Sequence, residues 1–251
     1  RFIPYGTHFI DKQDEKSVLR VLRSNFLTQG PEVNKLENKI AKFVGAKYAV
    51  AVSSASTGLH ISYIAAGLKK NDNFLSTPIT FVSTINGALF CGAKPYFSDI
   101  EKYSANLSSE NLIKNIKKRK IKLCVPVHMG GYPADMKKIQ KICKKNNINL
   151  IEDASHALGA KYKDGSRVGN CKYSLMTVFS LHPVKIIAGG EGGVITTNNK
   201  NIYENLKILR SHGIEKNNKN FKNKFFVHNK SAIPEPWAYE VQKIGFNYRL
   251  T

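Results

Sequence analysis

Apolar residues in this chain alternate between two spacings along most of its length, and this alternation limits the fold more than any other feature. Short apolar runs such as 48–52 have the length of buried strands, and the segments between them carry apolar residues at helical spacing. Repeated strand–helix units predict an α/β fold with a mostly parallel central sheet and helices on both faces. We expect strands at 48–52, 74–76, 94–97, 123–127, 149–151, 178–180 and 194–197.

Helices are expected between these strands. Asp11 is a good N-cap for a first helix that extends to about Ser24, and Pro31 begins a second helix that stops near Gly45. The stretch 214–236 breaks the pattern because it is basic, rich in asparagine and interrupted by prolines, so we interpret it as a long loop. Further helices are expected at 57–66, 82–90, 107–116, 135–145 and 201–212.

Ligands in open α/β sheets bind at the carboxyl ends of the strands. This rule selects strand-to-loop transitions that are rich in polar residues, glycine or proline. Because the carboxyl ends of parallel strands meet at one edge of the sheet, we expect these segments to lie close together. They are 53–57, 77–81, 127–131, 153–156 and 180–185.

Lys185 follows one of these strands and precedes a glycine-rich turn at 189–193. Such a turn lets the backbone approach a ligand closely. A lysine held there and partly removed from water has a lowered pKa and becomes a nucleophile toward aldehydes. An ordinary surface lysine beside a tight turn has the same sequence pattern, so Lys185 alone does not decide the chemistry.

Three other features of the sequence, together with Lys185, could bind one cofactor. Asp153 ends a strand, where it could hold the ring nitrogen of pyridoxal 5'-phosphate in its protonated form or simply cap a helix. The loop 53–58 opens a helix and could bind a phosphate or be an ordinary cap. Phe81 could stack on a flat ring or belong to the core. With Lys185 they supply the nucleophile, the acid, the anion site and the aromatic ring that pyridoxal phosphate requires.

The formal net charge of +21 raises nucleic-acid binding as a distant alternative. Basic runs at 114–122 and 137–145 fall on amphipathic helices, which favours solvated helix faces, and a third run lies at 216–224. No nucleic-acid recognition motif is present. The four cysteines form no CxxC pair and no histidine cluster accompanies them, so we expect reduced thiols and no metal site. No signal peptide or membrane-spanning run is visible, and we expect a cytoplasmic protein.

Several ordered motifs resemble the DegT/StrS-type sugar aminotransferases. The most specific is FSLHPVKIIAGGEGG at 179–193, and the others are LTQGPEV, TPITFVST, IEDASHALGA, LRSHGI and GFNYRLT. The resemblance implies the aspartate aminotransferase-like architecture (pyridoxal phosphate fold type I), with residues 1–251 as the cofactor-binding large domain. It also implies that the family's smaller C-terminal domain is missing here. The chain begins at Arg1 rather than methionine and stops at Thr251, so we interpret it as a fragment.

The resemblance assigns roles around the cofactor ring. Lys185 matches the catalytic lysine that holds the cofactor as a Schiff base. Asp153 matches the partner of the pyridine nitrogen, and Phe81 matches the aromatic residue that stacks on the ring. His156 stands where the family places a hydrogen-bond donor to the ring hydroxyl.

Further roles implied by the resemblance concern the cofactor's phosphate. Ser56 and Thr57 match the phosphate-binding pair, and Ser180 matches an additional phosphate contact. Asn247 matches an asparagine that reaches the cofactor of the neighbouring subunit, which implies a homodimer with composite active sites.

The implied activity is transfer of an amino group from glutamate to the C4 ketone of a nucleotide-linked 4-keto-6-deoxy sugar. The motif EDASHALGA and the GFNYRLT ending resemble the pseudaminic acid branch of the family, whose substrate is a UDP-linked N-acetyl-hexosamine. Dehydratases of the same family carry a histidine at this position. The lysine at position 185 therefore argues against a dehydration reaction. A regulatory protein that keeps the fold without turnover is the alternative that the sequence leaves open.

Overall fold

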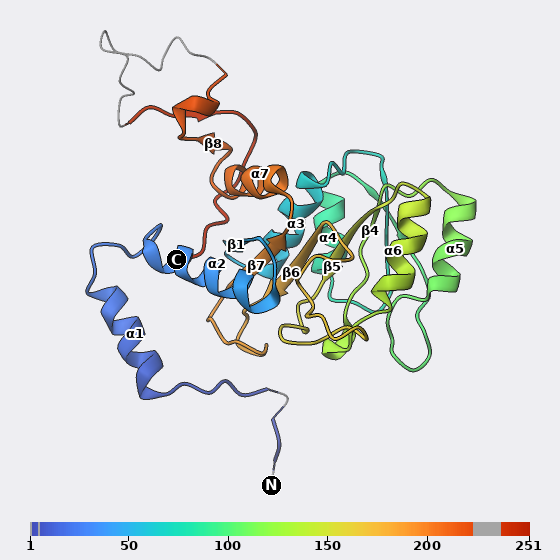
Figure 1. Ribbon diagram of the computed structural model, residues 1–251, viewed down its shortest axis with the longest axis horizontal. Helices are drawn as coiled ribbons and strands as arrows, with labels where there is room; N and C mark the ends of the chain where they lie inside the picture. The colour runs from blue at the N-terminus through green and yellow to red at the C-terminus, as the bar shows by residue number, and fades with distance from the viewer. Residues whose placement is uncertain (1, 5, 223–236) are drawn as a thin grey trace.

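The computed structural model describes residues 2–4, 6–222 and 237–251 (Figure 1). Its centre is a seven-stranded sheet in the order β1-β7-β6-β5-β4-β2-β3, in which β7 is antiparallel to β1 and β6 and the other pairs are parallel. This confirms the mostly parallel sheet. The strands are β1 (Tyr48–Val52), β2 (Asn73–Ser76), β3 (Lys94–Phe97), β4 (Leu123–Cys124), β5 (Asn149–Asp153), β6 (Met176–Ser180) and β7 (Gly193–Thr197).

Helices cover both faces of the sheet, as the alternating pattern predicts. One face carries α2 (Pro31–Val44), α5 (Ser109–Lys118) and α6 (Met136–Lys145), whose apolar residues share one core cluster. The opposite face carries α3 (Ala55–Ala65), α4 (Ser83–Phe90) and α7 (Lys200–Arg210), which contribute to a second cluster. The sheet is therefore buried between two helical layers (Figure 1).

The basic helices are amphipathic in the way that the sequence indicates. In α6, Met136, Ile139 and Cys143 are buried, whereas the lysines between them are exposed. In α5 the buried apolar residue is Leu112. Both helices therefore use one face for the core and leave their positive charges in solvent.

A buried ion pair fastens α2 and α7 to β1. The Nη1 group of Arg210 lies 2.6 Å from Oε1 of Glu37, and the same carboxylate oxygen accepts the N–H of Ala51 at 2.9 Å. Arg210 also donates to the carbonyl of Ala51 at 2.8 Å. Glu37 is only 7% exposed, so the guanidinium is needed to compensate its charge.

The helix α1 (Lys12–Leu22) begins after Asp11, whose side chain accepts the N–H groups of Gln13 and Asp14. This cap confirms the predicted start. The helix lies away from the sheet (Figure 1), and none of its residues is buried. Val18 is 59% exposed, so the apolar side of this helix does not contribute to the core.

Two expectations are wrong in detail. The strand expected at 123–127 has its regular ladder only at β4, because Pro126 has no N–H to donate, although Val127 still forms a bridge with Asp153. The stretch expected to be a loop begins with a strand, β8 (Ile214–Glu215), which pairs antiparallel with β9 (Glu240–Val241). A short 3-10 helix, η2 (Asn218–Asn220), follows β8, and the part of the predicted loop at 223–236 lies outside the described residues.

Across the described residues, no helix is both long and apolar enough to cross a bilayer. In the same part of the chain, no group of three or more histidine, cysteine, aspartate or glutamate side chains is arranged to hold a metal ion. The four cysteines are free thiols.

Candidate active site

A cavity of about 230 Å³ opens at the carboxyl edge of the sheet. Each of the strand-to-loop transitions selected from the sequence contributes to its wall. The lining residues are Ser54, Ala55, Ser56, Thr80, Phe81, Ser83, Val127, Met129, Asp153, Ser155, His156, Ser180, His182, Val184, Lys185 and Glu191. Six of the eight predicted site residues are therefore in one cavity: Ser56, Phe81, Asp153, His156, Ser180 and Lys185.

Asp153 is the last residue of β5 and is 3% exposed. Its Oδ2 accepts the hydroxyl of Thr84 at 2.7 Å, and its Oδ1 accepts the hydroxyl of Ser155 at 2.7 Å. None of the ion pairs among the described residues involves Asp153. The cavity thus contains a buried, oriented carboxylate that can receive a cationic N–H donor.

Lys185 lies in the loop after β6. Its backbone N–H donates to the carbonyl of His182 at 2.8 Å, and the loop is closed where Gly189 donates to the carbonyl of Leu181 at 2.7 Å. Partial burial lowers the pKa of Lys185, and the negative charge of Asp153 opposes this effect. Lys185 is therefore closer to its neutral, nucleophilic form than a surface lysine, while a carboxylate lies near enough to influence it.

His156 follows Asp153 by three residues and is half-buried in the same wall. Burial lowers its pKa, the charge of Lys185 lowers it further, and Asp153 has the opposite effect. These influences favour a neutral imidazole, which can donate one hydrogen bond and accept another.

The N-terminus of α3 forms the polar end of the cavity. Ser54 caps the helix by accepting the N–H of Thr57 at 3.2 Å, and the first-turn N–H groups of Ala55 and Ser56 have no acceptor within the helix. Gly193 lets β7 approach this turn, because a Cβ atom there would lie 2.6 Å from the backbone nitrogen of Ala55. Free N–H groups at a helix start favour a phosphate or another anion.

Phe81 lies just before α4 and is 72% exposed, so it is not a core residue. It lines the cavity and presents an aromatic ring to solvent there. This position is open to a flat ligand, as its predicted stacking role requires.

Thr57 and Asn247 are not among the residues that line the cavity. The hydroxyl of Thr57 takes part in the cap of α3, where it donates to the carbonyl of Ser54 at 2.8 Å. Asn247 is exposed and its backbone forms a bridge with Ser211. Their roles toward a phosphate remain predictions, and that of Asn247 concerns a neighbouring subunit.

A buried polar network lies directly behind this wall. Glu152 is fully buried, and its Oε2 accepts Nε2 of His128 at 2.8 Å and the hydroxyl of Tyr162 at 2.5 Å. Its Oε1 accepts the hydroxyls of Ser174 at 2.5 Å and Thr177 at 3.2 Å. Burial alone raises the pKa of Glu152, but these hydrogen bonds outweigh it and hold the pKa below the ordinary glutamate value.

The ring of His128 is held at both nitrogens in this network. Its Nδ1 accepts the backbone N–H of Ala134 at 3.0 Å, so the ring proton belongs on Nε2, facing Glu152. The backbone N–H of His128 also donates to the carbonyl of Asp153 at 3.0 Å. The network therefore holds the end of β5, and with it Asp153, in place.

Sequence reasoning missed the hydroxyls that orient Asp153 and the network around Glu152. Thr84 and Ser155 belong to motifs that were matched but given no role. Glu152 carries a signal that could have been used: a charged residue inside an apolar strand must find buried partners. Those partners come from distant segments, and only the fold brings them together.

Comparisons with known proteins agree with this geometry. The model of the DegT/DnrJ/EryC1/StrS aminotransferase family matches residues 8–251. The chain is 37% identical over 251 residues to the UDP-4-amino-4,6-dideoxy-N-acetyl-beta-L-altrosamine transaminase of Campylobacter jejuni, covering 99% of this chain and 61% of the relative.

Solved structures of aminotransferases are also similar to this chain. The fold is similar to that of Helicobacter pylori PseC, an aminotransferase involved in the biosynthesis of pseudoaminic acid, with a TM-score of 0.85 and 33% identity over 100% of this chain and 62% of that one. It is also similar to the aminotransferase from Psychrobacter cryohalolentis, with a TM-score of 0.87 and 29% identity over 100% and 60% of the two chains. The chain spans about three fifths of the length of these relatives. It belongs to the DegT/DnrJ/EryC1/StrS aminotransferase family.

Proposed function

We propose that this chain is the cofactor-binding part of a pyridoxal-phosphate-dependent aminotransferase that acts on a nucleotide-linked keto sugar. The observation that carries the proposal is the meeting of Lys185 and Asp153 in one cavity, close enough for Asp153 to influence the pKa of the amine. Pyridoxal phosphate supplies an aldehyde that bonds to amines and a protonated ring that accepts electrons.

The residues of the cavity fit this cofactor. Asp153 offers a buried carboxylate for the protonated ring nitrogen, and no other cation among the described residues occupies it. The first turn of α3, with Ser56, and the hydroxyl of Ser180 offer donors for the phosphate. Phe81 supplies an aromatic face, and His156 supplies a hydrogen bond for the ring hydroxyl.

Lys185 has two tasks in this proposal. Its neutral amine would hold the cofactor at the aldehyde carbon, which is also the group that the amino donor would reach. Its Nζ also accepts and returns the proton at the α-carbon of the amino donor. Both tasks need an amine with a lowered pKa, which partial burial provides.

The substrate proposal rests on the relatives. A relative named UDP-4-amino-4,6-dideoxy-N-acetyl-beta-L-altrosamine transaminase shares 37% identity across almost all of this chain. We therefore propose that glutamate donates its amino group to the C4 ketone of a UDP-linked 4-keto-6-deoxy-N-acetyl-hexosamine.

A half-reaction tests this function without the sugar. Protein loaded with pyridoxal phosphate is mixed with glutamate, and 2-oxoglutarate is measured together with the loss of the cofactor's visible band. We expect one 2-oxoglutarate per bound cofactor in the wild type and none in Lys185→Ala. Tight cofactor binding without 2-oxoglutarate would instead favour the regulatory alternative.

We also propose a cytoplasmic homodimer with composite sites. Asn247 is exposed and lies outside its own chain's cavity, as expected for a residue that serves a neighbour. Lys185→Ala and Asn247→Ala proteins, mixed under conditions of subunit exchange, should recover part of the half-reaction that each lacks. If mixing restores nothing although exchange is measured, Asn247 does not serve a shared site.

A further inference from the structure

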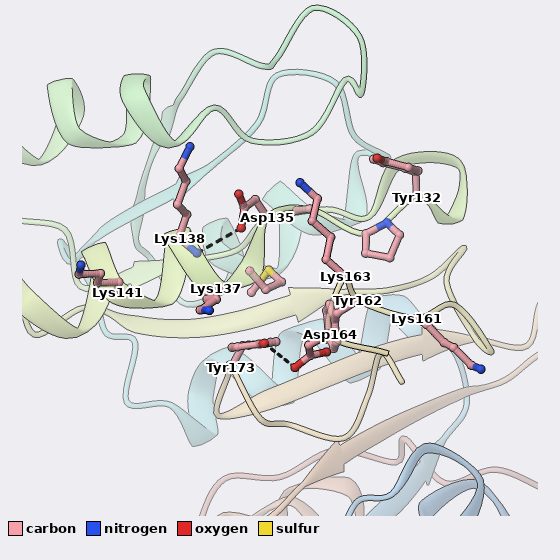
Figure 2. Close-up of a pocket in the computed structure, with 13 residues that line it drawn as sticks. Tyr132, Asp135, Lys137, Lys138, Lys141, Lys161, Tyr162, Lys163, Asp164 and Tyr173 are labelled. Atoms are coloured by element: carbon pink, nitrogen blue, oxygen red, sulfur yellow. Dashed lines mark hydrogen bonds between the residues drawn. The ribbon is translucent and has the colours of Figure 1, made fainter. Parts of the chain in front are cut away.

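A second, larger cleft of about 590 Å³ lies on the face of the sheet that carries α6 (Figure 2). Its walls are the start of α6, the segment that precedes it and the loop at 161–164. It shares no lining residue with the cavity that contains Lys185. The proposed aminotransferase function makes no use of it.

The cleft has an excess of positive charge. Five lysines line it, against two carboxylates: Lys137, Lys138, Lys141, Lys161 and Lys163 against Asp135 and Asp164. Figure 2 shows Lys138 and Lys163 extending on either side of Asp135, whereas Lys141 and Lys161 extend toward opposite ends. Within the described part of the chain, none of these five ammonium groups forms an ion pair.

Both carboxylates already have partners. Asp164 accepts Nζ of Lys172 at 2.6 Å and the hydroxyls of Ser166 at 2.6 Å and Tyr173 at 2.8 Å, and these hydrogen bonds hold its pKa far below the ordinary value. Asp135 caps α6 by accepting the N–H of Lys138 at 3.3 Å. Both carboxylates are therefore engaged in contacts within the protein. The five lysines that line the cleft are available to bind a ligand.

The floor of the cleft is fixed before any ligand arrives. Tyr162 is buried and donates to Glu152 at 2.5 Å, and its ring meets that of Tyr173 edge-on with centroids 5.1 Å apart. Tyr173 in turn holds Asp164. A preformed floor lowers the entropic cost of binding, because only the exposed lysine side chains must become ordered.

We propose that this cleft binds a small molecule that carries a diphosphate or triphosphate group. Lysine ammonium groups act as point charges toward phosphate oxygens. Several of them around one cleft suit a ligand with several negative charges better than they suit a ligand with a single carboxylate. A nucleoside diphosphate and inorganic pyrophosphate share this chemistry.

Calorimetric titration tests the proposal on protein loaded with pyridoxal phosphate, so that the anion site at the start of α3 is already occupied. Pyrophosphate and UDP are titrated separately at fixed ionic strength. We expect saturable binding at one cleft per chain, weakened by about tenfold or more in Lys138→Ala/Lys163→Ala because two charged contacts are lost. The matched control is Lys114→Ala/Lys117→Ala on α5, which removes the same charge elsewhere and should bind as the wild type does. Equal affinities for both ligands would identify the phosphates as the recognised group, and tighter binding of UDP that is lost in the cleft variant would identify a nucleotide as the ligand.

Two results would overturn the proposal: no saturable binding by the wild type, or an equal loss of affinity in the cleft variant and in the α5 control, which would indicate only the general positive field. The titration is repeated with Lys185→Ala, which should bind pyrophosphate normally. The cleft and the aminotransferase function can therefore fail independently of one another.

Discussion

Replacing Glu152 tests whether the network behind the active-site wall holds the fold together. Glu152→Ala removes the acceptor for four donors: Nε2 of His128 and the hydroxyls of Tyr162, Ser174 and Thr177. Glu152→Gln keeps the shape but removes the charge. Its amide oxygen can accept from His128 and Tyr162, and its NH₂ group can donate to the two remaining hydroxyls, which are free to rotate.

The loss of stability in both variants can be estimated from the hydrogen bonds that each one removes. Hydrogen bonds to a buried charged group contribute about 1.5–3 kcal/mol each, and unpaired buried donors carry a similar cost. Glu152→Ala leaves His128, which cannot turn its donor elsewhere because Nδ1 is engaged by Ala134, so we expect a loss of about 3–5 kcal/mol. For Glu152→Gln, which keeps neutral hydrogen bonds, we expect a loss of about 1–2 kcal/mol.

Urea unfolding followed by circular dichroism measures these losses. The matched control is Glu204→Gln, which removes an exposed glutamate whose ion pair with Lys207 is a 3.5 Å surface contact, and it should change stability by less than about 1 kcal/mol. If Glu152→Ala proved as stable as this control, the network around Glu152 would not contribute to the stability of the fold.

The pH dependence of stability gives a second check on Glu152. Its pKa in the folded protein lies below the ordinary value of 4.5, so its contribution is present above that pH and is lost as the pH falls through the lower folded-state value. The stability difference between the wild type and Glu152→Gln should therefore narrow below pH 4.5. A difference that stays constant into the acid range would contradict an ionised Glu152.

Three further substitutions test other parts of the account. Gly193→Ala places a methyl group 2.6 Å from backbone atoms at the start of α3, so it should lower the melting temperature and also weaken pyridoxal phosphate binding, measured by spectral titration. Arg210→Met leaves the buried carboxylate of Glu37 without its cation and should cost about 3–5 kcal/mol in urea unfolding. Thr84→Val removes one donor to the buried carboxylate of Asp153, so it should cost about 1.5–3 kcal/mol in urea unfolding and should also weaken cofactor affinity, because Asp153 loses a hydroxyl that orients it.

Local pattern predicted the sheet well. The strands expected at 48–52 and 94–97 match β1 and β3 residue for residue, because apolar runs and their bounding turns are set by neighbours in the sequence. The N-cap at Asp11 is likewise local, and the helix starts where that residue predicts. The pairing of β8 with β9 could not be predicted in this way, since its two strands lie more than twenty residues apart and are only two residues long.

In the candidate site, too, some features follow from simple sequence rules and others depend on contacts between distant residues. The rule that parallel strands end at one edge brought Asp153 and Lys185 together in prediction, and the cavity contains both. The orientation of Asp153 depends on Thr84, which lies 69 residues away, and no spacing rule connects the two. Thr57 shows the opposite case, because its hydroxyl takes part in a local cap that competes with the ligand role its motif implies.

The central claim is that Lys185 is the residue that takes the cofactor, and peptide mapping tests it most directly. The protein is incubated with one equivalent of pyridoxal phosphate, reduced with borohydride to make any lysine bond permanent, digested and analysed by mass spectrometry. We predict that the modification is concentrated on Lys185, although the chain has many more exposed lysines, and that Lys185→Ala loses it. Modification spread over the surface lysines, or left unchanged by Lys185→Ala, would contradict the account.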